Sequence, residues 1–321
     1  MASTRDETPT LASRLWPAAL TFAIFAVIFL RIPFGRFLDA VEHARWLPFL
    51  ALMASFSLCF FAVDTFVLLQ LVRWFHGPLR YRDLLPVRAS TYVVSIVNTQ
   101  LAQGALALYI HRRFGTPLGE IASTIALLIL LEVTQLVTFA TIGMIAFPGE
   151  VPAGLFAVPV VLAGIWIALV VIARRTADDG GGSRFSDLLR TFRRARPWQI
   201  VTVLALKAPV FVLSLLVHWT ALGLFGIQVP LDRLLAFLPI VYLVAALPVT
   251  VAHLGTSQAA WIFFFNDYAR EADLLAYSLA SHLTFMLANG TLGLVFLPKA
   301  YADLFVRRRR DDITRSASSE G

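Results

Sequence analysis

ASTYVVSIVNTQLAQGALALYI (Ala89–Ile110) and LLAFLPIVYLVAALPVTVAHLGTSQAAWIFFF (Leu234–Phe265) are the two stretches that decide the fold. Each has the length of a membrane span, but each carries hydroxyls and amides together with glycine or proline in its middle. Interrupted apolar segments at matching places in two halves of a chain are typical of the binding site of a membrane transporter. We therefore interpret both stretches as re-entrant helical hairpins.

The composition places the whole chain in a bilayer. Of its 321 residues, 58% are hydrophobic and 15% are charged, and the mean hydropathy is +0.75. Such a chain has too few polar side chains to cover a soluble surface. Apolar runs of at least about 18 residues mark complete spans. Six runs meet this length and predict six transmembrane helices: Leu15–Ile32, Trp46–Phe75, Leu118–Phe147, Val151–Ala173, Gln199–Gly223 and Leu274–Leu297.

The spacing of these runs predicts one polytopic membrane domain without a soluble domain. The first run has no small-residue cleavage site after it, so we expect a retained anchor. The only cysteine, Cys59, excludes an internal disulfide and a cysteine metal cluster. The expected segments are a tail over 1–14, a membrane domain over 15–306 with halves at 15–147 and 151–297, a basic linker over 174–198, and a disordered tail over 307–321.

The positions of lysine and arginine predict the topology. The net charge of +7 follows from 27 basic and 20 acidic side chains, which we attribute to the positive-inside rule and not to nucleic-acid binding. If only the six complete spans cross, 21 basic residues are cytoplasmic, Arg88 among them, and 5 are outside. If both interrupted stretches also cross, the split becomes 13 to 13. The rule therefore favours re-entrant hairpins, with both termini cytoplasmic.

In this topology the two hairpins enter from opposite sides, which is typical of an inverted-topology repeat. A faint internal similarity supports the repeat. YVVSIVNTQLAQG (Tyr92–Gly104) corresponds to YLVAALPVTVAHLG (Tyr242–Gly255), and a short connector and a complete span follow each. The predicted fold is an all-α integral membrane protein with about six transmembrane helices and two re-entrant helical hairpins.

Two motifs within these segments resemble a known family. NTQLAQGALALYIHRRFGTPLGEIASTIALLILLE (Asn98–Glu132) and LPVTVAHLGTSQAAWIFFF (Leu247–Phe265) resemble the flippase-like transmembrane family, which also forms the N-terminal membrane part of bacterial lysylphosphatidylglycerol synthases. The resemblance covers nearly the whole chain. It implies translocation of lipid between leaflets of a bacterial inner membrane. We expect no synthase reaction and no other enzymatic activity.

Four departures from the family pattern remove charges. Gly104-Ala105 replaces the usual Gly-Glu, and the arginine expected shortly afterwards is apolar. Gln258 stands where the family has glutamate, and His282 stands where it usually has arginine in the last span. We expect recognition to depend on helix openings after Gly104 and Gly255, where unpaired backbone N–H groups face a polar substrate group.

Ionisable groups inside the bilayer are candidates for function because each costs about 2.5–3.5 kcal/mol to insert. Glu132 lies deepest in its span and is either functional or a structural acid paired with Lys207. Lys207 is either a counter-ion for a headgroup or a residue that snorkels or pairs. Asp64 is a possible partner for Lys207. His282 is either a satisfied core residue or the substitute for the family's cation.

The interrupted stretches supply the remaining candidates. Polar groups at membrane depth either hold helices together or line a wet cavity. Both interpretations remain open for these residues: Asn98, Gln100, Gln103 and Gly104 in the first stretch, and Pro248, Gly255 and Gln258 in the second. No spacing of His, Asp, Glu or Cys indicates a metal site, and we expect no cofactor.

The basic linker predicts an interfacial helix. Phe185, Leu188, Leu189 and Phe192 follow helical spacing among the arginines of 184–198, which predicts an amphipathic helix that binds anionic lipid of the cytoplasmic leaflet. The first functional hypothesis is a translocator of a lipid or a lipid-linked substrate. The alternatives are a non-transporting scaffold for a lipid-modifying enzyme and a secondary transporter of a small solute. The sequence identifies no protein partner.

Overall fold

The structure is a computed structural model that describes residues 11–97, 99–147, 153–178, 184–246, 250 and 254–301. Within these ranges every regular element is a helix. The elements are α1 (Leu11–Arg31), α2 (Phe34–Glu42), α3 (Trp46–Phe75), α4 (Tyr81–Val97), α5 (Thr99–Phe114), α6 (Leu118–Ala146), η1 (Ala153–Phe156), α7 (Ala157–Asp178), α8 (Arg184–Leu188), α9 (Arg190–Arg194), α10 (Pro197–Leu224), α11 (Leu231–Ala245), α12 (Thr256–Phe265) and α13 (Glu271–Tyr301).

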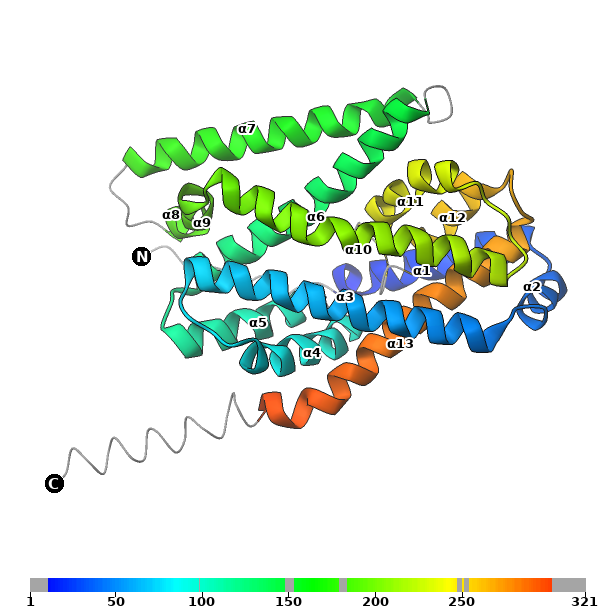
Figure 1. Cartoon of the computed structure of the whole chain (residues 1–321), viewed down its shortest axis with the longest axis horizontal. Coiled ribbons are helices and arrows are strands. Elements are labelled where there is room, and N and C mark those ends of the chain that lie inside the picture. The colour runs from blue at the N-terminus through cyan, green and yellow to red at the C-terminus, as the bar shows by residue number, and fades with distance from the viewer. Residues whose placement is uncertain are drawn as a thin grey trace.

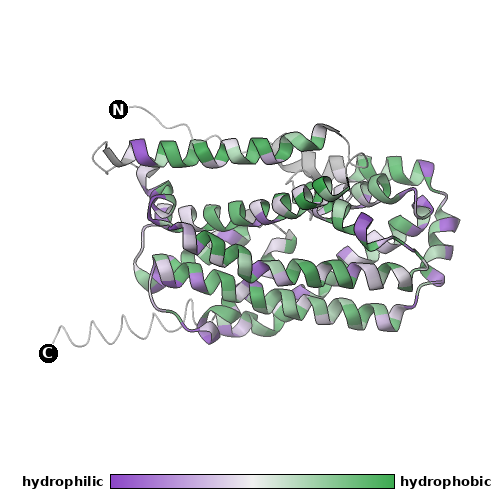
Figure 2. Ribbon diagram, turned by 45° about the horizontal axis from the view of Figure 1, so that its top comes forward, coloured by the Kyte–Doolittle hydropathy of each residue, from purple (hydrophilic) through white to green (hydrophobic). Residues whose placement is uncertain are grey.

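Five of the six predicted spans correspond to long helices, and the first corresponds to one member of a bent pair of helices. Among the described residues, α3, α6, α10, α13 and the helix over Gly154–Thr176 are each long and apolar enough to cross a bilayer. The part of α1 over Thr21–Arg31 meets the same criterion only when it is taken together with α2, which is turned from it by 89°. Hydrophobic residues dominate the middle of the long helices in Figure 2. The chain is therefore a multi-pass, all-α membrane protein, which confirms the predicted fold class.

Each interrupted stretch forms a pair of helices. Helices α4 and α5 pack against each other, as do α11 and α12. The first pair is longer than the predicted Ala89–Ile110, because the polar residues before Ala89 already belong to α4. Figure 1 shows α4 and α5 toward the end of the bundle that holds α8 and α9, and α11 and α12 toward the end that holds α2. The two hairpins thus lie at opposite ends of the bundle.

The packing of the hairpins is reciprocal between the two halves. Helix α4 packs on α13, whereas α11 packs on α6, and α3 packs on α10 between them. Glycine allows the close approach in both hairpin contacts. A Cβ at Gly293 would lie 2.5 Å from the Ala89 carbonyl oxygen, and one at Gly143 would lie 2.6 Å from Ala236 Cα. An inverted repeat would produce this pairing; the repeat and the re-entrant membrane path stay predictions.

The basic linker differs from the single amphipathic helix that was predicted. It forms two short helices, α8 and α9, separated at Leu189, and both pack on α6. Thr191 is buried and exchanges a 2.8 Å hydrogen bond with Thr124, while Arg190 and Arg194 bind Glu120 at 3.1 and 2.6 Å. These contacts dock the linker on the bundle because a buried carboxylate needs cationic partners. Its binding of anionic lipid stays a prediction.

Candidate functional site

A cavity of about 460 Å³ lies inside the bundle, between helices of both halves. Helices α3, α6, α10, α11, α12 and α13 all contribute to its lining. Its wall is mostly apolar and aromatic and includes Phe56, Phe60, Phe211, Trp261 and Phe285. The volume falls within the range of about 300–1,000 Å³ that is usual for small-molecule sites.

Charged residues gather at one end of this cavity. Lys207 on α10 donates to Glu132 Oε1 on α6 at 2.5 Å, and its Nζ lies 3.6 Å from Asp64 Oδ1 on α3. Three helices are therefore joined by one ammonium group. Both pairings that the sequence left open for Lys207, with Glu132 and with Asp64, are present, and all three residues line the cavity.

Arg88 on α4 completes the charged end, and sequence analysis missed it. Its guanidinium donates to Asp64 Oδ2 through Nε at 2.8 Å, and Nη2 lies 2.6 Å from the same oxygen. Tyr92, one turn later, donates to that oxygen at 3.0 Å. Arg88 was counted with the cytoplasmic loop because the helix was expected to begin after it. The available signal was the i, i+4 spacing of Arg88 and Tyr92 beside an unmatched intramembrane acid.

The two acids of this cluster differ in the exposure of their side chains and in the number of groups that contact them. The side chain of Asp64 is 2% exposed and is contacted by Arg88, Tyr92 and Lys207. The side chain of Glu132 is 39% exposed, and among the described residues Lys207 alone hydrogen-bonds to it. Two acids and two bases make the cluster neutral overall. Glu132 is thus the acid best placed to meet a molecule in the cavity.

The opposite end of the cavity carries hydroxyl and imidazole groups. His218 lies eleven residues after Lys207 on α10, or roughly 16 Å along the helix. Its Nδ1 lies 2.5 Å from the Tyr277 hydroxyl, and Ser214 and Tyr242 exchange a hydrogen bond of the same length. The first end of the cavity carries carboxylate and ammonium groups, whereas this end carries hydroxyl and imidazole groups.

His282 on α13 also lines the cavity, together with Phe285. The cavity therefore brings together four of the predicted residues: Asp64, Glu132, Lys207 and His282. It also includes groups that sequence analysis did not select, above all Tyr242, Ser214 and Trp261.

Among the residues predicted around the two glycines, those that the structure describes, Gln103, Gly104, Gly255 and Gln258, do not line the cavity. The expected helix opening is confirmed at Gly255, which has φ of +94° and directly precedes α12. Gln258 is fully buried and its Oε1 accepts the Gly255 N–H at 2.6 Å, so this amide caps the helix. Gly255 also packs against Ile24 of α1, which a Cβ would approach to 3.1 Å.

The expected helix opening at Gly104 is wrong. Helix α5 begins at Thr99, and Gly104 lies inside it. A Cβ at Gly104 would meet no atom within 4 Å, so neither a turn nor a close contact requires glycine there. Gln103 is a half-buried residue of the same helix. Asn98 and Pro248 lie outside the described residues, and α5 includes Gln100, whose side chain is likewise outside them.

The described ranges contain no group of three His, Cys, Asp or Glu side chains suited to binding a metal ion.

The chain was compared with known protein families and with curated proteins. The sequence model of the family described as the lysylphosphatidylglycerol synthase TM region matches residues 15–293. No curated protein matches the chain. The family match covers most of the chain and confirms the resemblance drawn from its two motifs.

Proposed function

Starting from the premise that the chain belongs to the lysylphosphatidylglycerol synthase transmembrane-region family, we propose that it translocates a lipid or a lipid-linked substrate. Membership ties this multi-pass membrane protein to lipid biology. In our proposal the polar headgroup passes through the central cavity while the acyl chains stay in the bilayer. The protein resides in a bacterial inner membrane with both termini cytoplasmic.

One observation carries this proposal: Glu132 is half-exposed in a cavity that otherwise has mostly apolar walls. A charge at membrane depth costs about 2.5–3.5 kcal/mol on insertion scales, and such residues commonly mark substrate pathways. Lys207 offsets part of this cost but leaves Glu132 Oε2 without a hydrogen bond among the described residues. That oxygen is available to accept a hydrogen bond from a headgroup.

Reconstituted vesicles test the proposal. The purified protein should move a fluorescent phospholipid between leaflets, measured by the loss of fluorescence when dithionite is added outside. Glu132→Gln should slow this movement at least about tenfold, the effect of losing one charge-assisted hydrogen bond. Glu271→Gln, at an exposed acid in the first turn of α13, is the matched control and should leave the rate unchanged.

Two outcomes would contradict the proposal. If Glu132→Gln and Glu271→Gln transport equally well, the acid only anchors Lys207, and the headgroup takes another path. If the wild-type protein moves no lipid at all, the translocator proposal fails.

A scaffold for a lipid-modifying enzyme is the second candidate, and α7 favours it. Only 6% of the most apolar 18-residue segment of this helix is buried, compared with 28–50% for the corresponding segments of the other four long helices. The family description names the membrane region of a synthase. An enzyme's own membrane helix would find an uncovered apolar surface on α7. Co-purification of a lipid-modifying enzyme that is lost in Val161→Asn and Ile165→Asn would support this function, whereas retention in both variants would reject it.

A further inference from the structure

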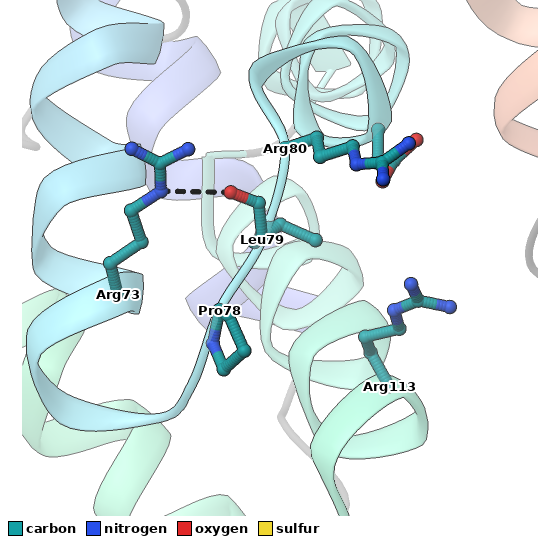
Figure 3. Close-up of a pocket in the computed structure, with 6 residues that line it drawn as sticks. Arg73, Pro78, Leu79, Arg80 and Arg113 are labelled. Atoms are coloured by element: carbon teal, nitrogen blue, oxygen red, sulfur yellow. Dashed lines mark hydrogen bonds between the residues drawn. The ribbon is translucent and has the colours of Figure 1, made fainter.

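A second pocket lies outside the central cavity, at the end of the bundle where α3, α4 and α5 meet. It encloses about 670 Å³ and is lined by Arg73, Pro78, Leu79, Arg80, Asp83 and Arg113. Figure 3 shows the three arginines on different elements, α3, the 77–80 connection and α5, with Arg73 turned to the Leu79 carbonyl and with Arg80 and Arg113 on the other side of the connection. Arg73 lies nine residues beyond Asp64 on α3, roughly 13 Å farther along the helix. The pocket is therefore separate from the charged end of the cavity.

The connection between α3 and α4 is held in place and fixes the shape of this pocket. Arg73 Nε donates to the Leu79 carbonyl oxygen at 2.8 Å, and the Leu79 side chain is 4% exposed. Gly77 has φ of +152° and lies against Phe114 of α5, since a Cβ there would approach that ring to 3.0 Å. A side chain at this position would push the connection away from α5. The glycine thus keeps the connection that carries Arg80 close to α5, which carries Arg113.

The charge of the pocket is positive and is only partly compensated. Three guanidinium groups face one carboxylate, Asp83, which leaves a net charge of +2. Within the described part of the chain, no hydrogen bond or ion pair engages the guanidinium of Arg80 or Arg113. Both residues are exposed, so their donors can be reached from outside the bundle. Like charges gathered without a partner repel one another, and an anion would relieve this repulsion.

The positive-inside rule alone does not explain this arrangement. That rule requires basic residues in a cytoplasmic loop but places no condition on their convergence. Arg82, which is also exposed in the first turn of α4, satisfies the rule without lining the pocket. The end of α3 and the α4–α5 hairpin, which carry the lining residues, lie toward the same end of the bundle as α8 and α9 (Figure 1), the end predicted to be cytoplasmic. The cytoplasmic leaflet carries the anionic lipids of a membrane.

We propose that Arg73, Arg80 and Arg113 form a binding site for the phosphate group of an anionic membrane lipid. Guanidinium groups bind phosphate through paired, charge-assisted hydrogen bonds, and three of them match a phosphate monoester with up to two negative charges. The volume exceeds what inorganic phosphate needs and suits a headgroup with part of its glycerol. This site is distinct from the proposed translocation path.

Binding to the detergent-purified protein tests the site without requiring transport. Titration calorimetry with dioctanoyl phosphatidic acid should show saturable binding, with dioctanoyl phosphatidylcholine, glycerol phosphate and inorganic phosphate as the other ligands. Arg80→Gln and Arg113→Gln should each weaken phosphatidic acid binding at least about tenfold through the loss of charge-assisted hydrogen bonds. Arg82→Gln is the matched control and should bind normally. Asp83→Asn removes the opposing charge and should bind more tightly.

The outcomes separate the sources of the phosphate and the two proposals. Binding of phosphatidic acid well above glycerol phosphate and phosphatidylcholine supports a lipid. Equal binding of glycerol phosphate or inorganic phosphate overturns the lipid source and assigns the site to a soluble phosphate compound. An equal effect of Arg82→Gln and Arg80→Gln, or no binding at all, overturns the site. Glu271→Gln, at an exposed acid outside both sites, should bind phosphatidic acid like the wild type. Because the binding measurement needs no transport, a failure of the translocator proposal leaves this test intact.

Discussion

Two tyrosines at corresponding positions in the two halves of the bundle form different contacts. Tyr92 and Tyr242 occupy corresponding positions in the internal similarity, on α4 and α11. Tyr92 donates to a carboxylate on α3, Asp64, whereas Tyr242 bonds with a hydroxyl on α10, Ser214. Asp64 and Ser214 are both buried. The same helix-to-helix link is therefore ionic in the first half and neutral in the second.

This difference shows that similar helix packing does not require similar chemistry. The first link needs Arg88 and Lys207 as partners because a buried carboxylate is costly without cations. The second link is complete with two hydroxyl groups. In our proposal a headgroup meets charge at one end of the cavity and only neutral polar groups at the other. Such an asymmetric path gives a charged headgroup a preferred side.

The largest expected effect separates Asp64 from Ser214. Asp64→Asn should lower the free energy of unfolding by about 3–5 kcal/mol, because it leaves the buried guanidinium of Arg88 without its carboxylate. Ser214→Ala removes only a neutral hydrogen bond and should cost about 0.5–1.5 kcal/mol. Thermal unfolding of both variants in the same detergent, followed by tryptophan fluorescence, measures the difference.

A double variant tests whether the ion pair causes this effect. Adding Arg88→Gln to Asp64→Asn removes the unpaired cation and should recover part of the lost stability. If Asp64→Asn loses no more stability than Ser214→Ala, the two links are energetically alike, and the contrast between the halves has no thermodynamic meaning.

The tyrosines themselves give a smaller contrast. Tyr92→Phe removes a hydrogen bond to a charged acceptor and should cost about 1.5–3 kcal/mol, whereas Tyr242→Phe should cost about 0.5–1.5 kcal/mol. Both substitutions keep the ring, so packing changes little. The same unfolding measurement compares them. A larger loss for Tyr242→Phe would reverse the assignment of the ionic half.

Sequence alone predicts the helices well because their signal is local. Apolar runs such as Trp46–Phe75 need only length and hydropathy to be recognised, and α3 has these same bounds. The pairing of Lys207 with Glu132 and Asp64 was also accessible, since buried charges must find partners. Arg88 was missed because its helix begins seven residues before it, at Tyr81, and polar residues in that first part hide the helical signal.

Helix boundaries at the glycines and the docking of the linker were less accessible because they depend on backbone conformation and on contacts between distant elements. Gly104 and Gly255 look alike in the sequence, yet one lies inside a helix and the other starts one. Only a backbone conformation separates them. The docking of α9 on α6 likewise depends on Glu120, which attracts Arg190 and Arg194 from about 70 residues away. A composition-based reading assigns those arginines to lipid.

The smallest expected effect concerns pH and lies outside the spans, at His76. Burial lowers the pKa of His76 below its usual 6.5, and nearby Arg194 lowers it further, against the opposing charge of Glu120. Its Nε2 lies 2.9 Å from Thr124 Oγ1, and its buried Nδ1 has no hydrogen-bond partner among the described residues. The neutral ring is therefore favoured in the folded state.

As pH falls below about 6.5, the unfolded chain takes up the proton first, and stability is lost between pH 6.5 and the lower pKa of His76 in the folded state. Unfolding temperatures measured from pH 7.5 to 5.5 should fall less in His76→Gln than in the wild type, with His43→Gln, at an exposed histidine, following the wild type. Parallel curves for all three proteins would show that His76 does not set the response to acid.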